Sequence, residues 1–283
     1  MDPVFLIFIF LAALFLAYAN GANDNFKGVA TLYGSNTLTY KKALFWTTLT
    51  TVLGSLMSFY LAGELIIVFK GTGLVPENII AMQSFPLAVG LAAALTVMLA
   101  TFLNLPVSTT HALIGALAGA GWIASEAGIN WVKLSEKFFL PLIGGPLLSV
   151  ALAFALYPLF RTLRKKFKIG QETCFCLGEK VLATAPGHVA STEEFLKNFS
   201  ESIALPEAVI ADQAYCRSSY TGRIAGVSAR SILDGLHYLS SGLVCFARGL
   251  NDTPKIAALL LMGSRFDLNF SIFMVGVIMM VGG

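Results

Sequence analysis

Long apolar segments alternate with short polar breaks along most of the chain. The segments are residues 4–19, 43–69, 85–103, 112–124, 139–160, 231–247, 256–262 and 269–283. A helix needs about 20 apolar residues to cross a bilayer, and several of these segments reach that length. We therefore predict an all-α polytopic membrane protein.

Three polar breaks lie within apolar sequence rather than between spans. Residues 20–25 interrupt the first segment, and residues 248–255 interrupt a later one in the same way. Residues 104–111 separate two apolar pieces over residues 85–124. We predict two broken helices and one helical hairpin, because polar breaks at membrane depth are typical of transporters with discontinuous helices.

A basic cluster follows the apolar segment 139–160, between Arg161 and Lys168, and polar sequence continues to about Gly222. Basic residues beside a span indicate the cytoplasmic side. We predict a first transmembrane repeat over residues 1–160, a cytoplasmic insert over 161–222 and the start of a second repeat over 223–283.

Two parts of the insert favour regular secondary structure. Residues 173–185 have strand character, and the acidic stretch 193–201 suits a helix. The chain ends within apolar sequence at residues 281–283, so we expect the second repeat to be incomplete.

Counting spans gives an orientation. With Lys41 and Lys42 inside, segment 43–69 runs outward, the hairpin returns to its own side, and segment 139–160 runs inward to the basic cluster. The two apolar segments interrupted by residues 20–25 and 248–255 then run in opposite directions. This is the signature of inverted repeats in secondary transporters.

Composition agrees with a membrane protein. Hydrophobic residues make up 56% of the chain and charged residues 12%, whereas soluble domains carry about 25% charged residues. The net charge of +3 forms no basic face, so we expect no nucleic-acid partner. The four cysteines lack zinc-finger spacing and are expected to be free thiols. The leader carries Asp2 and no Lys or Arg, which argues against a cleaved signal peptide.

The pattern G-x-N-D-x-x-K occurs at both interrupted segments, over residues 21–27 and 249–255. An Asp at membrane depth costs about 2.5–3.5 kcal/mol on insertion scales, so two such residues indicate a functional site. The predicted cation or coupling residues are Asn23, Asp24, Asn251 and Asp252. Their oxygens suit Na⁺, and a protonated Asp is the other means of coupling. No other metal site is predicted.

The alternative is structural. Each Asp lies three residues before a lysine, Lys27 or Lys255, and the pairs would share a helix face and neutralise one another. These lysines are also candidates for binding an anion.

The turn at residues 106–111 is the second candidate centre. Ser108, Thr109 and Thr110 offer three hydroxyls at the start of a helix, where free N–H groups and the helix dipole favour an anion. The alternative is an ordinary capping segment. His111 and Arg248 are secondary candidates, since either residue could contact an anion or serve packing alone.

Together these motifs resemble the inorganic phosphate transporter (PiT) family. The resemblance rests on Gly21-Ala22-Asn23-Asp24, Gly249-Leu250-Asn251-Asp252 and Pro106-Val107-Ser108-Thr109-Thr110-His111, followed by Gly115, Gly119 and Gly121. It implies a cation-coupled phosphate symporter, with Asp and Asn on the cation, Ser and Thr hydroxyls on the anion, and a homodimer. Lys27 and Lys255 depart from the family, which has Asn at these positions, so H⁺ coupling competes with Na⁺ coupling. Some relatives carry sulfate.

The expected function is import of inorganic phosphate by alternating access, coupled to H⁺ or Na⁺, in the plasma (cytoplasmic or inner) membrane. A sulfate or other oxyanion permease of the same fold, or a passive anion channel, is the alternative. The histidines and aspartates form no nucleophile–base motif, so we predict no enzyme and no cofactor beyond Na⁺ as a candidate coupling ion. The expected partners are phosphate and the lipid bilayer.

Overall fold

The computed structural model describes residues 2–61, 63–126, 128–169, 173–178, 207–212, 227–262 and 266–283. The chain divides into two units, one of Met1–Ser149 with His237–Gly283 and the other of Val150–Leu236. The first unit carries both G-x-N-D-x-x-K motifs and the hairpin.

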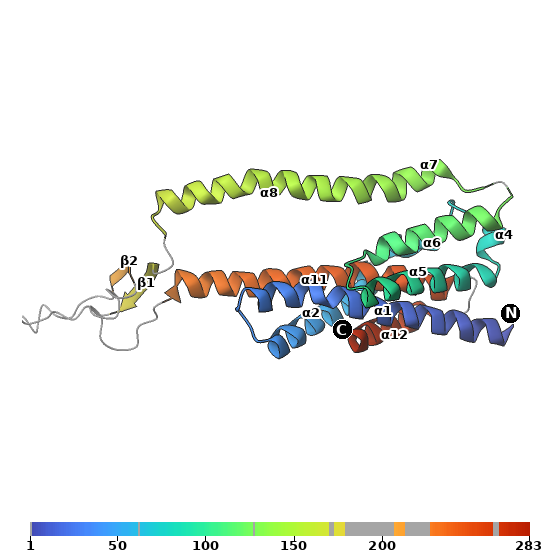
Figure 1. The fold of residues 1–283 in the computed structure, drawn as a ribbon, viewed down its shortest axis with the longest axis horizontal. Coiled ribbons are helices and arrows are strands. Elements are labelled where there is room, and N and C mark those ends of the chain that lie inside the picture. The colour runs from blue at the N-terminus through green and yellow to red at the C-terminus, as the bar shows by residue number, and fades with distance from the viewer. Residues whose placement is uncertain are drawn as a thin grey trace, which may run out of the picture. The chain divides into compact units, whose positions relative to one another are not determined.

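The first unit is helical (Figure 1). Its helices are α1 (Pro3–Gly34), α2 (Tyr40–Leu61), α3 (Gly63–Phe69), α4 (Glu77–Ile80), α5 (Ser84–Phe102), α6 (Thr109–Ala124), α7 (Trp131–Leu134), a π-helical turn (Ser135–Phe139) and α12 (Leu268–Gly282). Helix α8 (Leu140–Lys166) begins in this unit, and α11 (Ala229–Leu261) ends in it. Buried side chains of α1, α5, α6, α11 and α12 form one apolar core.

Four helices in the described part of the chain are long and apolar enough to cross a membrane. They cover Pro3–Gly34, Tyr40–Leu61, Ser84–Phe102 and Trp131–Lys166. These helices confirm the prediction of an α-helical polytopic membrane protein. Many large apolar side chains are exposed and available for contact with lipid.

The two predicted helix breaks are wrong. Helix α1 runs unbroken through residues 20–25, and α11 runs unbroken through the second motif with Pro254 inside it. The reason lies in the motif glycines, which serve close packing. A Cβ on Gly21 would collide with the Met279 carbonyl of α12, and a Cβ on Gly249 would collide with the Thr51 carbonyl of α2.

The predicted hairpin of α5 and α6 is confirmed. Asn104 adopts a left-handed φ of 56°, and Leu105 N–H donates to the Ala100 carbonyl over 2.8 Å. This is the geometry of a Schellman cap, which ends α5. Ser108 then caps α6, its side chain accepting from His111 N–H over 3.3 Å.

Other expectations were partly correct. The segment 43–69 holds two helices, α2 and α3, rather than one span. In the second unit, β1 (Thr173–Gly178) confirms the first part of the strand character predicted for residues 173–185, and residues 179–185 lie outside the described residues. Strand β1 pairs antiparallel with β2 (Glu207–Asp212) and β3 (Val227–Ser228) in the order β2-β1-β3. The acidic stretch 193–201 lies outside the described residues.

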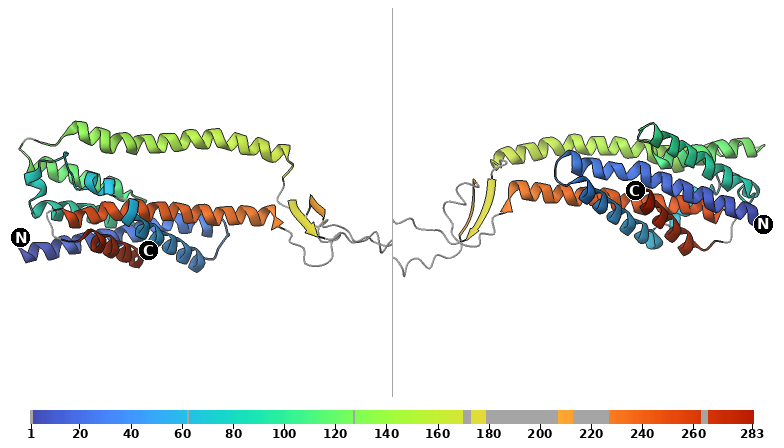
Figure 2. Two further views of the ribbon diagram at one scale, coloured as in Figure 1. Left: turned by 180° about the vertical axis from the view of Figure 1, so that it is seen from behind. Right: turned by 60° about the horizontal axis from the view of Figure 1, so that its bottom comes forward.

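Helices α1 and α11 lie alongside one another and run antiparallel (Figures 1 and 2). Asn20 of α1 contacts Asp252 of α11, and further along α1 the Gly28 carbonyl accepts from the Ser241 hydroxyl over 3.2 Å. As residue numbers rise along α1, those of the contacting residues on α11 fall. This arrangement brings both motifs to one level beside the start of α6.

Candidate functional site

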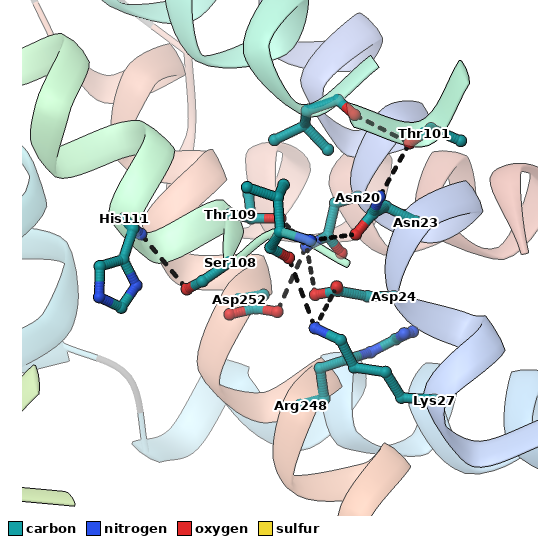
Figure 3. A network of polar contacts seen from close by, with 12 residues as sticks. Asn20, Asn23, Asp24, Lys27, Thr101, Ser108, Thr109, His111, Arg248 and Asp252 are labelled. Atoms are coloured by element: carbon teal, nitrogen blue, oxygen red, sulfur yellow. Dashed lines mark hydrogen bonds and ion pairs between the residues drawn. The ribbon is translucent and has the colours of Figure 1, made fainter. Parts of the chain in front are cut away.

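Asn20 is the residue that joins the two motifs (Figure 3). Its Nδ2 lies 3.3 Å from Oδ2 of Asp24 and 3.3 Å from Oδ2 of Asp252. The same nitrogen lies 2.7 Å from the Thr109 hydroxyl of α6. One buried amide therefore links both carboxylates to the hairpin.

Lys27 forms the ion pair of the first motif. Its Nζ lies 2.6 Å from Asp24 Oδ1 and 3.5 Å from the Val107 carbonyl. The Lys27 side chain is 44% exposed, whereas that of Asp24 is 5% exposed. The first ion pair thus opens on one side.

Lys255 forms the matching pair in the second motif, and it is buried. Its Nζ lies 3.5 Å from Asp252 Oδ1 and donates to the Thr110 hydroxyl over 2.7 Å. It also lies 5.4 Å from the centre of the Phe69 ring, within range of a cation–π interaction. The ion pair of each Asp with the Lys three residues on, which the sequence offered as the structural alternative, forms at both motifs.

A cavity of about 230 Å³ opens at this cluster. Its lining residues include both motif carboxylates, two basic side chains and the start of α6. They are Asp24, Lys27, Gly28, Ser108, Thr109, Thr110, Val244, Cys245, Arg248, Asn251 and Asp252. Lys255 lies behind this lining, against Thr110 and Asp252.

Arg248 lines the cavity and has a partly free guanidinium. Its Nη2 donates to the Thr51 hydroxyl of α2 over 3.1 Å. Its Nε and Nη1 are buried and have no hydrogen-bond partner among the described residues. Because a buried donor without a partner is costly, these two nitrogens indicate a place for an acceptor such as an anion.

The two motif asparagines lie in different places. Asn23 holds the hairpin turn: its Nδ2 donates to the Thr101 hydroxyl over 3.0 Å and to the Leu105 carbonyl over 3.2 Å, and its Oδ1 accepts from Val107 N–H over 3.3 Å. Asn251 is exposed and lines the cavity. The structure therefore directs Asn23 toward the turn and Asn251 toward the cavity.

His111 lies away from the two carboxylates. Its side chain is exposed and lines a separate hollow with Val107 and Ala112. In Figure 3 the imidazole points to the far side of Ser108 from Asp24 and Asp252. The geometry does not join His111 to the cavity.

The roles of Asn20 and Thr51 were not predicted from the sequence. Asn20 lies four residues before Asp24, so the spacing alone places both on one face of a helix. Thr51 belongs to a buried polar stripe on α2, with Thr47, Thr50, Ser55 and Ser58. Such a stripe in an otherwise apolar span indicates a face that packs against another helix, and this pattern is readable from the sequence.

Comparison with known proteins identifies the family. The sequence profile of the phosphate transporter family matches residues 20–283. The chain belongs to the phosphate transporter family. The resemblance drawn from the motifs is thereby confirmed.

Several relatives and one solved structure agree with this membership. A probable low-affinity inorganic phosphate transporter of Streptomyces halstedii is 27% identical over 182 residues, which are 60% of this chain and 82% of the relative. The sodium-dependent phosphate transporter 1 of Xenopus tropicalis is 31% identical over 46% of this chain and 19% of its own length. A putative phosphate permease of Chlamydia pneumoniae is 30% identical over 56% of this chain and 38% of its own. The chain thus spans less than half of two of these relatives.

The solved structure titled "The sodium-dependent phosphate transporter" shares the fold. The two align with a TM-score of 0.66 over 99% of this chain and 74% of the other, at 17% identity. The phosphate transporter family is a family of transporters rather than enzymes. The long apolar helices of this chain agree with a membrane protein.

Proposed function

We propose that this chain forms the first repeat, the insert and the start of the second repeat of a secondary transporter that imports inorganic phosphate. Import proceeds by alternating access, coupled to H⁺ or Na⁺, in the plasma membrane. The family membership supports the substrate class, and the cavity at Asp24 and Asp252 supplies the binding site.

The observation that carries this proposal is the partly free guanidinium of Arg248. Its Nε and Nη1 are buried without a partner, and the residue lines a cavity that also receives the N-terminus of α6. Helix N-termini and guanidinium groups are both strong partners of phosphate oxygens. The hydroxyls of Ser108 and Thr109 line the same cavity and can add donors.

The charges of the cluster suit an anion. Lys27, Lys255 and Arg248 carry three formal positive charges, and Asp24 and Asp252 carry two negative charges, which leaves a formal charge of +1. Without the basic side chains the two carboxylates would repel any anion.

The carboxylates favour phosphate over sulfate. At neutral pH phosphate keeps at least one O–H group, which can donate a hydrogen bond to a carboxylate of Asp24 or Asp252. Sulfate is acceptor-only, so its oxygens would meet carboxylate oxygens without a proton between them. Sites built to accept a substrate hydrogen bond reject analogues that lack it.

The antiparallel course of α1 and α11 supports two inverted repeats, because it sets the two copies of one motif in opposite directions. Motion of one repeat against the other would expose the cavity to each side in turn. The homodimer remains a prediction from the family resemblance.

Uptake of labelled phosphate into proteoliposomes that hold the full-length protein tests the proposal. We expect accumulation against a phosphate gradient when an ion gradient is imposed, and little competition by sulfate. Arg248→Met should lower uptake by about tenfold or more, because a charge-assisted hydrogen bond is lost. The exposed Arg161 of α8 provides the matched control, Arg161→Met, which should leave uptake unchanged.

Two results would contradict the proposal. Equal uptake of sulfate would indicate a general oxyanion permease. Equilibration of phosphate without accumulation under any gradient would indicate a passive channel.

A further inference from the structure

The names of two relatives raise the question of Na⁺. The Xenopus transporter and the solved structure are both described as sodium-dependent. Asp24 and Asp252 are the acidic residues that line the cavity, so their carboxylates are the candidate ligands of Na⁺ in this chain. The lysines of the two motifs decide whether it fits.

The first carboxylate is already occupied by a cation. Hard cations such as Ca²⁺ lie about 2.3–2.6 Å from their oxygen ligands. The ammonium nitrogen of Lys27 lies 2.6 Å from Asp24 Oδ1, so it stands where a metal cation would bind that oxygen. The other oxygen, Oδ2, faces the amide nitrogen of Asn20, which is a donor and not a metal ligand.

The second carboxylate also has a lysine beside it, at the longer distance of 3.5 Å, and this lysine is enclosed. Lys255 Nζ is held by Asp252 Oδ1, by the Thr110 hydroxyl and by the face of the Phe69 ring. The side chains of Lys255 and Asp252 are 5% and 9% exposed, so bulk cations have little access to the pair. The residues present therefore do not fit Na⁺ at either motif.

We propose that the ammonium groups of Lys27 and Lys255 replace bound Na⁺, so that phosphate transport by this protein does not require Na⁺. This inference rests on the proposed function. Two carboxylates beside an anion need positive charge between them, and here that charge is covalently attached to the protein. The charge of the cavity is therefore the same whether or not Na⁺ is present outside.

The two lysines differ in how readily they can be replaced. Lys255 is enclosed, whereas Lys27 is 44% exposed and closes the open side of Asp24. Removing the Lys27 side chain should leave a vacant position beside Asp24 that solvent cations can reach. Lys27→Ala should therefore create a Na⁺ site that the natural protein lacks.

The first test compares uptake in media that differ only in cation. Full-length protein in proteoliposomes is given labelled phosphate with Na⁺, K⁺ or choline at equal ionic strength and pH gradient. We expect initial rates to agree within about twofold, since no cation site has to be filled. A fall of about tenfold or more on replacing Na⁺ would overturn the inference and leave the proposed function intact. No uptake in any medium would instead refute the proposed function.

The second test measures binding directly. Radioactive Na⁺ is added to detergent-solubilised full-length protein, and bound counts are read by scintillation proximity. We expect no saturable binding to the natural protein and saturable binding to Lys27→Ala. In choline medium Lys27→Ala should lose about tenfold in uptake, and Na⁺ should restore part of it.

Lys137 provides the control, because it is exposed and lies outside the cavity. Lys137→Ala should bind no Na⁺ and transport as the natural protein does. Saturable Na⁺ binding by the natural protein, or normal Na⁺-free uptake by Lys27→Ala, would overturn the inference. A melting temperature of Lys27→Ala close to that of the natural protein confirms that the variant is folded.

Discussion

The two copies of G-x-N-D-x-x-K are nearly the same in sequence and differ in their surroundings. Both hold an Asp–Lys pair at i, i+3 on an unbroken helix. In α1 the pair is short, at 2.6 Å, and its lysine is open to solvent. In α11 the pair is longer, at 3.5 Å, and both members are enclosed.

The difference comes from what packs on each motif. The first motif faces the hairpin turn, which takes up Asn23 and leaves the end of Lys27 uncovered. The second motif packs against α2 at Gly249, and Lys255 contacts Thr110 of α6 and the ring of Phe69. The same sequence pattern therefore places an enclosed lysine in α11 and a solvent-accessible lysine in α1.

The largest effect is expected at the enclosed pair. Lys255→Met leaves the Asp252 charge buried without its ammonium partner, which should cost about 3–5 kcal/mol of stability and abolish uptake. Thermal unfolding in detergent and phosphate uptake measure the two effects. The double variant Asp252→Asn/Lys255→Met should recover much of the stability and none of the uptake. If Lys255→Met melts as the natural protein does, the pair is not enclosed as described.

The next effect is expected at Asn20, which joins the two motifs. Asn20→Ala removes the donor shared by Asp24 and Asp252, and hydrogen bonds to charged groups contribute about 1.5–3 kcal/mol each. We expect uptake to fall by about tenfold, read as the initial rate. Asn20→Asp keeps the size but adds a third carboxylate, so it should be more damaging. If both variants take up phosphate at the rate of the natural protein, the link that Asn20 makes between the two carboxylates is not needed for transport.

A smaller effect is expected at Asn23. Asn23→Ala removes three hydrogen bonds to the α5–α6 turn, each worth about 0.5–1.5 kcal/mol. The loss should appear as faster amide hydrogen exchange over residues 103–108, with a modest drop in uptake. Unchanged exchange in this turn would show that Asn23 does not hold it.

The smallest effect is expected at Asn251, the matching position in α11. Asn251 is exposed and makes no hydrogen bond among those described, so Asn251→Ala should change stability by less than about 0.5 kcal/mol. The same melting experiment compares it with Asn23→Ala. A large loss of uptake with unchanged stability would show that Asn251 contacts the substrate. Asn23 would then stabilise the turn, and Asn251 would bind the substrate.

The hairpin shows what local sequence can predict. Asn104 favours the left-handed conformation that ends α5, and Ser108 supplies the cap that starts α6, so both ends were readable. The helix breaks show the opposite case. Gly21 and Gly249 were interpreted as breaks, although their role is to let α12 and α2 approach.

The sequence by itself determined the apolar spans, the hairpin, both Asp–Lys pairs and the family, because these depend on composition or on residues within a few positions of each other. Only the tertiary structure decided that Asn20 joins the two motifs, that Thr51 leaves two nitrogens of Arg248 free, and that Lys255 is enclosed while Lys27 is not. These features depend on how α1, α2, α6 and α11 pack. Contacts between segments far apart in the chain leave no periodic trace in either segment alone.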